Sequence, residues 1–392
     1  MKRVRWRVTK PLRDRVLAGH PWVYDRALAP PKGIKTGDLV TLVDEKGPLA
    51  TAIADPSSPL AARVLDLDPA ATCDGAWARR RCEEAAARRS RDPLLVGCTG
   101  RRLVHGEADG CPGLVVDAYT DTAVIVFDGP GVAEFWRARM ADVLAGLERG
   151  GAMIEHVWLR GQRGERMHGE ALRGDPPDEI VINEDDARFG VDVRSGQKTG
   201  FFLDQRDNRR TIRKHAAGAT VLNVFSYTGG FSIHAALGGA TKVTSVDIAH
   251  PAIAAIERNV ALSGLDIAAH ERVAVDAFDF FERAAKQGRT WDLVIVDPPS
   301  FAPNERSKTA ALRAYERLAT AALAVTSQGG RFALASCSSH ITEGDLLGVV
   351  ANITTIGPTL RLRTAAGAGS DHPVLPAFSE GRYLKFLFFD KP

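Results

Sequence analysis

From about Gly200 to the C-terminus, short apolar runs alternate with stretches whose apolar residues recur at helical spacing. This alternation is typical of a parallel β-sheet with helices on both faces, so the C-terminal half is predicted to be a Rossmann-like α/β domain. A first helix is expected over residues 205–216, capped by Asp204. Strands are predicted at residues 221–224, 243–246, 271–275, 293–296, 330–336, 360–363 and 383–389. Further helices are expected to begin near Phe231, His250, Ala277, Lys308 and Thr342.

The stretch from Thr220 to Asp247 (TVLNVFSYTGGFSIHAALGGATKVTSVD) is predicted to form a strand, a glycine-containing turn, a helix and a second strand ending in an acid. In a parallel sheet this unit places a helix N-terminus and a carboxylate at the same edge, where a nucleoside can bind. Because no G-x-G-x-x-G is present, a purely structural βαβ turn remains the alternative. The candidate ligand contacts in the turn are Asn223, Ser226, Tyr227, Thr228, Gly229 and Gly230.

Polar residues follow the predicted strands at the ends where ligands of open α/β sheets bind. Asp247 ends the second strand, Asp276 follows the third and Asp297 the fourth. Cys337 follows the fifth, among serines and a histidine. One acid at a strand end is common, because capping residues favour such places. Three acids, a glycine turn and a cysteine at successive strand ends predict a binding site.

The same residues favour S-adenosylmethionine as the ligand. Asp247 stands where ribose hydroxyls need an acceptor, and Asp276 lies one strand further out, where an adenine amino group can be bound. The turn at Gly229 and Gly230 leaves room for the amino-acid portion of the ligand. A pyrophosphate would favour a more glycine-rich turn, so NAD is the weaker alternative.

Asp297 and Cys337 indicate the reaction class. If the fourth and fifth strands are neighbours, about 4.8 Å apart, both residues open on one pocket. A cysteine thiolate there can attack carbon 6 of cytosine or uracil, which makes carbon 5 nucleophilic enough to take a methyl group. Asp297, in its Asp-Pro-Pro sequence, suits either a pyrimidine ring nitrogen or the exocyclic nitrogen of a purine. A packed and unreactive Cys337 is the structural alternative.

The composition sets few further limits. The chain has five cysteines and no C-x-x-C, so neither a disulfide framework nor a metal site is predicted, and the other four cysteines are expected to be small buried hydrophobes. The formal net charge of +3 is compatible with a nucleic-acid binder only if the basic residues cluster. No secretory signal and no apolar run of about 18 residues is present, so no membrane association and a cytoplasmic location are expected.

The N-terminal part is predicted to contain two smaller domains. Residues 1–75 show short strands separated by turns, which suggests a small β-barrel. Its basic start, KRVRWR, either faces phosphate or is a solvated edge strand. Residues 76–186 begin with an Ala- and Arg-rich helix over 76–91, interpreted as a surface linker helix, with RNA contact by its arginines as the alternative.

The rest of the central region is expected to be α+β. Expected strands cover residues 114–116, 123–127 and 154–159, an amphipathic helix covers 132–147, and a hairpin joins 180–184 to 188–193. The glycine-containing basic loop over residues 160–166 is either RNA-facing or only solvated. The methyltransferase-like part then covers residues 187–392.

The sequence resembles the bacterial ribosomal-RNA cytosine-5 methyltransferases of the RlmI type. The matching stretches keep one order over nearly the whole chain, which is more specific than any single motif. They are GHPWVYDRAL (Gly19–Leu28), EADGCPGLVVD (Glu107–Asp117), GQKTGFFLDQRDNR (Gly196–Arg209), NVFSYTGGFSIHAALGGA (Asn223–Ala240), SVD (Ser245–Asp247), DPPSFA (Asp297–Ala302), SCSSHIT (Ser336–Thr342) and DHPVLPAFSEGRYLK (Asp371–Lys385).

This resemblance implies an N-terminal PUA-type RNA-binding barrel, a central α/β domain and a C-terminal class I methyltransferase domain. It implies S-adenosylmethionine as methyl donor and Cys337 as the nucleophile on a cytosine of RNA, most naturally 23S ribosomal RNA. The turn over residues 226–230 and Asp247, Asp276 and Asp297 map to cofactor contacts. Gln205, at the start of its helix, is implied to hold the methionine end.

One departure from the family pattern is Ser300, where a lysine often follows Asp-Pro-Pro. Two alternative functions stay open from the sequence. One is methylation of another base, guanine above all, with Cys337 merely packed. The other is a non-catalytic RNA-binding ribosome assembly factor. The sequence also leaves a homodimer open.

Overall fold

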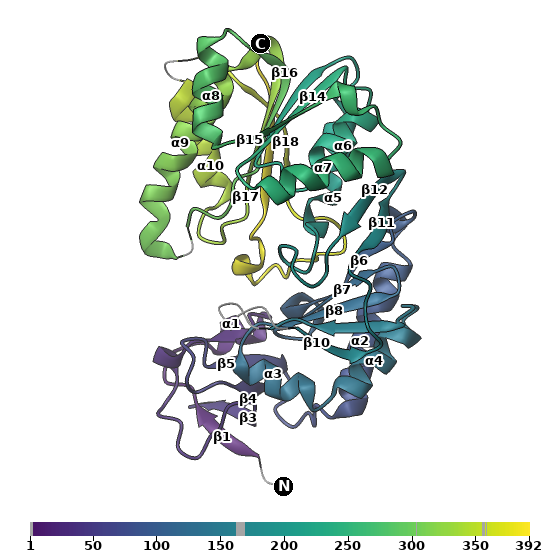
Figure 1. Ribbon diagram of the computed structural model, residues 1–392. Coiled ribbons are helices and arrows are strands. Elements are labelled where there is room, and N and C mark those ends of the chain that lie inside the picture. Colours follow the sequence, from purple (N-terminus) through teal and green to yellow (C-terminus); the bar gives the residue numbers. More distant parts are fainter. Residues whose placement is uncertain (1–2, 162–168, 303, 355–356, 358) are drawn as a thin grey trace. The chain divides into compact units, whose positions relative to one another are not determined.

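The computed structural model describes residues 3–161, 169–302, 304–354, 357 and 359–392 (Figure 1). The chain divides into two compact units. The first comprises Met1–Ile182, Val191–Leu203 and Ser370–Gly381, and the second comprises Asn183–Gly190, Asp204–Gly369 and Arg382–Pro392. The boundaries expected near residues 75 and 186 stay a prediction. Within the described ranges, no helix combines the length and the apolar character needed to cross a bilayer.

The N-terminal part of the first unit forms a five-stranded sheet of order β1-β3-β4-β5-β2. The short strands expected here are present, and their core includes Trp6, Val40 and Leu42. The elements are β1 (Val4–Arg7), α1 (Arg13–Leu17), β2 (Trp22–Val23), β3 (Leu39–Asp44), β4 (Gly47–Ala54) and β5 (Ala62–Asp66).

The basic start of the chain forms the edge strand β1, which is parallel to β3. Trp6 is buried and its Nε1 donates to the carbonyl oxygen of Ala29 at 2.7 Å, whereas Arg5 and Arg7 are exposed. Arg3 donates to Thr51 and to the carbonyl oxygen of Ala71. Lys2 lies outside the described residues.

A second five-stranded sheet of the first unit has the order β10-β9-β8-β7-β6. Its core contains Trp136, Leu103 and Ile125. The elements are α2 (Gly75–Ser90), β6 (Gly100–His105), β7 (Leu114–Tyr119), β8 (Thr122–Phe127), α3 (Pro130–Arg137), α4 (Met140–Arg149), β9 (His156–Leu159) and β10 (Glu170–Arg173).

The interpretation of residues 76–91 as a surface linker helix was wrong. Helix α2 packs against α4 and buries Trp77, Cys82 and Ala85 in the core of this sheet. Its Arg89 is buried as well and donates to the carboxylate of Asp109 at 2.7 Å. The run of alanines therefore provides a face of small residues that allows α2 and α4 to pack closely. A helix exposed on all sides would not need such a face.

The single helix expected over residues 132–147 is two helices, α3 and α4. The chain turns at Ala138 and Arg139, where the Arg139 guanidinium donates to the carbonyl oxygens of Cys73 and Phe135. The expected hairpin is present as β11 (Ile180–Glu184) and β12 (Ala187–Val191). Most of the predicted basic loop, from Gln162 onward, lies outside the described residues.

The second unit contains a seven-stranded sheet of order β15-β14-β13-β16-β17-β19-β18. The first five strands in this order are parallel, and β19 is antiparallel to both of its neighbours. Its direction was not predictable, because a strand buried on both faces shows the same apolar run in either direction. The strands are β13 (Thr220–Val224), β14 (Lys242–Asp247), β15 (His270–Ala274), β16 (Trp291–Val296), β17 (Thr326–Ser336), β18 (Arg361–Ala366) and β19 (Lys385–Asp390).

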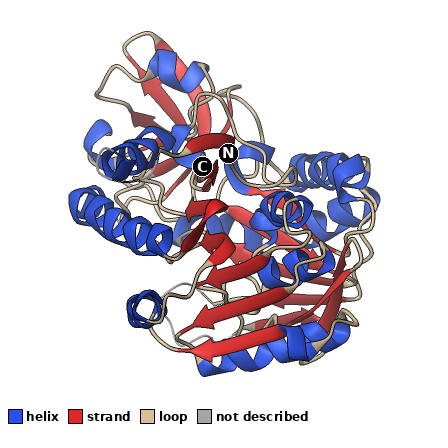
Figure 2. Cartoon of the chain, turned by 90° about the horizontal axis from the view of Figure 1, so that it is seen from above, coloured by secondary structure: helices blue, strands red, loops and turns tan. Residues whose placement is uncertain are grey.

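Helices lie on both faces of this sheet, as the alternating pattern predicts (Figures 1 and 2). On one face, Phe281 and Tyr315 of α8 and α9 pack with Leu222 and Val224. On the other, Ala235 of α6 packs with Val221, the strand residue of opposite orientation. The helices are α5 (Arg206–Lys214), α6 (Gly230–Leu237), α7 (His250–Leu262), α8 (Ala277–Lys286), α9 (Lys308–Ala324) and α10 (Glu343–Thr354).

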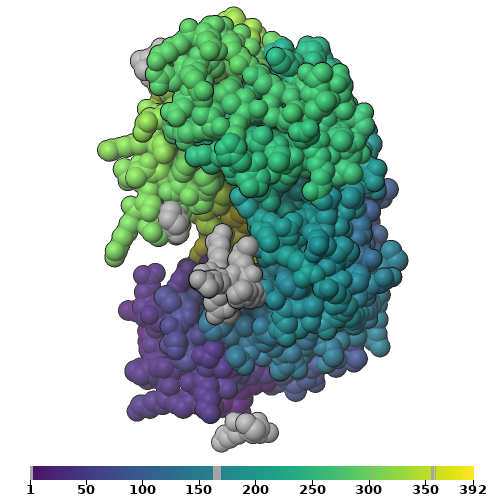
Figure 3. Space-filling view, viewed as in Figure 1, coloured from purple at the N-terminus to yellow at the C-terminus, as the bar shows by residue number. Residues whose placement is uncertain are grey.

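The N-cap position of α5 is one residue later than predicted, so it is not Asp204. A 3-10 turn over Leu203–Gln205 precedes the helix, and Gln205 takes the N-cap position. The carboxylate of Asp204 accepts a hydrogen bond from the Tyr383 hydroxyl at 2.6 Å. In Figure 3 the segment containing α9, in light green, forms part of the surface of the second unit.

Candidate active site

The turn between β13 and α6 has an unusual backbone. Phe225, Tyr227 and Gly229 have φ values of 61°, 47° and 85°. Only glycine adopts this left-handed region freely, and a non-glycine residue held there costs on the order of 1–3 kcal/mol. A Cβ at Gly229 would lie 3.1 Å from Ile256, and one at Gly230 would lie 3.0 Å from Arg209. Backbone strain of this kind, held by close packing, is typical of ligand-binding turns.

Asp247 joins this turn to the end of β14. Its Oδ2 accepts from the backbone N–H of Tyr227 at 2.8 Å, and its Oδ1 accepts from that of Ala249 at 2.9 Å. The carboxylate is thus fixed at the predicted strand end, beside the predicted turn. Its binding of ribose hydroxyls stays a prediction.

Asp276 and Asn223 have clear structural contacts in addition to their predicted roles. The exposed Asp276 caps α8 by accepting from the backbone N–H of Phe278 at 2.8 Å. Asn223 is buried, and its Nδ2 donates to Ser232 at 2.9 Å, which in turn bonds Ser245 at 2.7 Å. Asn223 therefore links β13 to α6 and β14 beneath the turn. Cofactor contact by either residue stays a prediction.

Gln205 connects the start of α5 to the end of β16. Its Nε2 donates to Oδ2 of Asp297 at 2.8 Å, and its Oε1 accepts from Asn208 Nδ2 at 2.6 Å. Asn208 also donates to the carbonyl oxygen of Gly367 at 3.0 Å. This chain of amides orients the half-buried carboxylate of Asp297. The structure thus brings together two site residues that are far apart in sequence.

Cys337 lies just past the end of β17 and is half-buried, whereas the other four cysteines are buried as expected. Strands β16 and β17 are hydrogen-bonded neighbours, with Val296 paired to Leu334. The fourth and fifth predicted strands are therefore neighbours, as a shared pocket for the two residues requires. Asp297 and Cys337 follow the same ends of adjacent parallel strands.

Hydroxyl groups surround the Cys337 loop. Tyr315 of α9 donates to Ser336 at 2.8 Å, and Ser338 bonds Ser300 at 2.8 Å. Burial raises the pKa of Tyr315 to about 12, and the charges of Cys337 and Asp297 act in the same direction, against hydrogen bonds with Ser336 and Ser338. Ser300 thus ties the loop after β16 to the loop after β17.

Sequence reasoning did not single out Lys385. This lysine of β19 is only 5% exposed, and its Nζ donates to the carbonyl oxygens of Ser338 and Tyr383. A lysine within the apolar run YLKFLFF was the available signal, because lysine is almost never fully buried without a reason.

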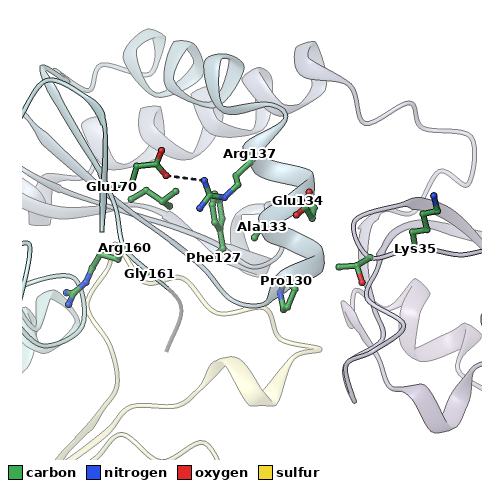
Figure 4. A pocket seen from close by; sticks show the side chains of 11 residues that line it. Lys35, Phe127, Pro130, Ala133, Glu134, Arg137, Arg160, Gly161 and Glu170 are labelled. Atoms are coloured by element: carbon green, nitrogen blue, oxygen red, sulfur yellow. Dashed lines mark hydrogen bonds and ion pairs between the residues drawn. The ribbon is translucent and has the colours of Figure 1, made fainter. Parts of the chain in front are cut away.

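A separate hollow of about 510 Å³ lies in the first unit (Figure 4). Its lining combines cations and carboxylates, including Lys35, Arg160 and the ion pair of Arg137 with Glu170 at 3.4 Å. It contains none of the predicted site residues.

A family model described as S-adenosylmethionine-dependent methyltransferase matches residues 101–347. The chain belongs to this family. A PUA-like domain model matches residues 7–67 of the same methyltransferase. The expected fold class is thus confirmed, with a class I methyltransferase fold and an N-terminal PUA-like domain.

Curated relatives resemble this methyltransferase over nearly their whole length. The ribosomal RNA large subunit methyltransferase of Deinococcus radiodurans is 37% identical, with 98% of this chain and 97% of the relative covered. The ribosomal RNA large subunit methyltransferase I of Aeromonas salmonicida is 35% identical, with 95% of each chain covered. That of an Escherichia coli strain is 33% identical, with 94% and 95% covered.

Solved structures show the same fold. A methyltransferase in complex with S-adenosylhomocysteine superposes with a TM-score of 0.86 at 23% identity, covering 99% of this chain and all of the other. An S-adenosylmethionine-dependent methyltransferase from Streptococcus mutans gives a TM-score of 0.85 at 22% identity, with the same coverage.

The cofactor of this methyltransferase is S-adenosylmethionine, and the strand-end residues fit it. Ser226 Oγ, Thr228 Oγ1 and Asn223 Oδ1 are buried atoms with no hydrogen-bond partner in the part of the chain that the structure describes. Because buried polar atoms are normally bonded, the turn has unused capacity for a polar ligand. The match to the methyltransferase family, rather than these atoms, sets the NAD alternative aside.

Proposed function

We propose that this methyltransferase transfers a methyl group to carbon 5 of a cytosine in ribosomal RNA, most directly 23S ribosomal RNA. The names of its curated relatives support ribosomal RNA of the large subunit as the substrate. The observation that carries the choice of base is the place of Cys337. It is the one half-buried thiol among the five cysteines, and it stands beside Asp297 at the ends of adjacent strands.

The bound cofactor supplies an electrophilic methyl group. The Cys337 thiolate adds to carbon 6 of the base, and the electron pair of the former double bond makes carbon 5 nucleophilic. Asp297, oriented by Gln205, accepts a hydrogen bond at the polar edge of the base and borders the cofactor. Carbon 5 would take the methyl group of the bound cofactor, with S-adenosylhomocysteine as the leaving group. Carbon 5 then loses its proton to a base, the carbon–carbon double bond re-forms, and the carbon–sulfur bond breaks to release Cys337. The strained turn over residues 226–230, Asp247 and Asp276 hold the cofactor in this proposal.

The function is tested by incubating the protein with methyl-labelled S-adenosylmethionine and ribosomal RNA, followed by digestion to nucleosides. Label is expected in 5-methylcytidine alone. Label in guanosine would support methylation of another base and contradict the proposal. RNA binding without any methyl transfer, in the presence of bound cofactor, would favour a non-catalytic assembly factor.

We expect the edge strand β1 to contact RNA phosphates through Arg5 and Arg7, which are exposed on the PUA-like domain. The double variant Arg5→Ala/Arg7→Ala should weaken RNA binding because each phosphate contact releases counterions. The slope of log K against log salt should fall in magnitude by about 1.5 for two lost contacts. Filter binding at several salt concentrations measures this slope.

The matched control removes two other exposed arginines, Arg149 of α4 and Arg283 of α8. This control variant loses the same net charge. An equal change of slope in both double variants would show a general charge effect and would exclude β1 as the specific contact.

A further inference from the structure

Lys385 is a buried cation at the edge of the candidate active site. Its Cα pairs with that of Ser336 in the antiparallel ladder of β17 and β19, so its side chain stands beside the start of the Cys337 loop. From there Nζ donates to the carbonyl oxygens of Ser338, one residue past Cys337, and of Tyr383. The ammonium thus holds the backbone on the far side of Cys337.

No carboxylate of the described residues forms a salt bridge with Lys385. Within the described residues, its nitrogen bonds only the two carbonyl oxygens. The negative groups whose charges act on it are Cys337 and Asp345. Asp345 already pairs with Lys308 at 2.9 Å. Since a buried ammonium without a counter-charge is costly, a thiolate at Cys337 is the partner that offsets this cost.

The other ionisable groups near the thiol act in the opposite sense. Tyr315 of α9 and Asp297 after β16 face the same loop, and a negative charge on Asp297 disfavours a second one on Cys337. Burial lowers the pKa of Lys385 to about 8, although the charges of Cys337 and Asp345 act to raise it. Lys385 therefore carries its proton at neutral pH.

We infer that Lys385 is a positioning residue for the nucleophile, which fixes the Cys337 loop through the Ser338 carbonyl and favours the Cys337 thiolate through its positive charge. This inference rests on the proposed function, in which Cys337 attacks the base. A lysine that only ties the loop together is the competing explanation. The two differ in what the charge does to the thiol.

The test measures the pH dependence of iodoacetamide alkylation at Cys337 in the full-length protein, with the modified peptide quantified by mass spectrometry. The variants are Lys385→Met, which removes both charge and donor, and Lys385→Gln, which keeps an N–H donor for the carbonyl. In both variants the midpoint of the alkylation profile should rise by about one pH unit, which reduces the rate near pH 7 about tenfold. Lys385→Arg, which keeps the charge, should remain closer to the parent.

If the alkylation midpoint of Lys385→Gln matched that of the parent, the inference would be overturned. Lys385 would then act only by its hydrogen bond to the Ser338 carbonyl. If Lys385→Met fails to fold, Lys385→Gln and Lys385→Arg still distinguish an effect of the positive charge from an effect of the hydrogen bond that holds the loop. Folding is checked by the rise in melting temperature on adding S-adenosylhomocysteine. Alkylation needs no RNA, so this assay can support or contradict the role of Lys385 independently of whether the proposed function is correct. A raised midpoint together with full turnover of Cys337→Ala would refute the nucleophile while keeping the effect of Lys385.

Discussion

Cys337→Ala is expected to abolish methyl transfer to ribosomal RNA while leaving cofactor binding unchanged. Cys337 lies past the end of β17 and is only half-buried, so its replacement by alanine should cost little stability. Without the thiolate, carbon 5 of the base is not activated, and turnover should fall at least about 10³-fold, or about 4 kcal/mol in transition-state stabilisation. Single-turnover assays with labelled S-adenosylmethionine measure this loss.

The covalent step can be tested directly with RNA that carries fluorine at carbon 5 of cytosine. Fluorine cannot leave as a proton does, so the adduct should persist on a denaturing gel with the parent protein and be absent with Cys337→Ala. Cys98→Ala, which removes a buried thiol of the first unit, is the matched control and should keep near-parental turnover. Turnover that survives in Cys337→Ala would refute the covalent mechanism and favour methylation of another base.

The sequence predicted those parts of the fold that depend on local patterns. The strand–helix alternation located every strand of the seven-stranded sheet, because apolar runs and turn residues act within a few positions of each other. It also predicted that Asp297 and Cys337 would follow strands, and the order of the sheet confirms that these strands are neighbours. In a parallel sheet, residues that follow successive strands lie at the same edge, so a site at this edge can be predicted from the sequence.

The features that sequence missed depend on contacts between distant segments. The burial of α2 required knowledge of α4, and the Asp204 carboxylate takes a partner, Tyr383, from the far end of the chain. The contact between Gln205 and Asp297 joins a helix start to a strand end 92 residues away. Local propensity contains no information about such partners, so these interactions appear only once the sheet is assembled.

The same limitation applies to Glu184, which the sequence places simply at the end of a hairpin strand. The structure buries its carboxylate between Arg209, at 2.7 and 2.5 Å, and His234, at 2.9 Å. Burial alone would raise the pKa of Glu184, but the charge and hydrogen bonds of Arg209, together with the nearby His234, outweigh it and hold the pKa well below its usual range. Because Arg209 also lies against Gly230, this ion pair supports the turn between β13 and α6, which is predicted to hold the cofactor.

Glu184→Gln is therefore expected to lower the free energy of unfolding by about 3–5 kcal/mol at pH 7, since it removes the buried negative charge that Arg209 contacts at 2.7 and 2.5 Å. Urea unfolding followed by circular dichroism measures this difference. The folded-state pKa of Glu184 lies below the unfolded value of 4.5, so its contribution is present above about pH 4.5 and is lost as the pH falls towards the folded-state value. The difference between parent and variant should accordingly narrow in acid.

Asp186→Asn is the matched control, because Asp186 on the same hairpin pairs with Arg213 but its side chain is 59% exposed. Exposed ion pairs contribute at most about 1 kcal/mol, so this variant should unfold close to the parent. If the two substitutions lowered stability equally, burial of the Glu184 charge would not be the cause. If Glu184→Gln left stability intact but weakened S-adenosylhomocysteine binding, the ion pair would act on the turn at Gly230 alone.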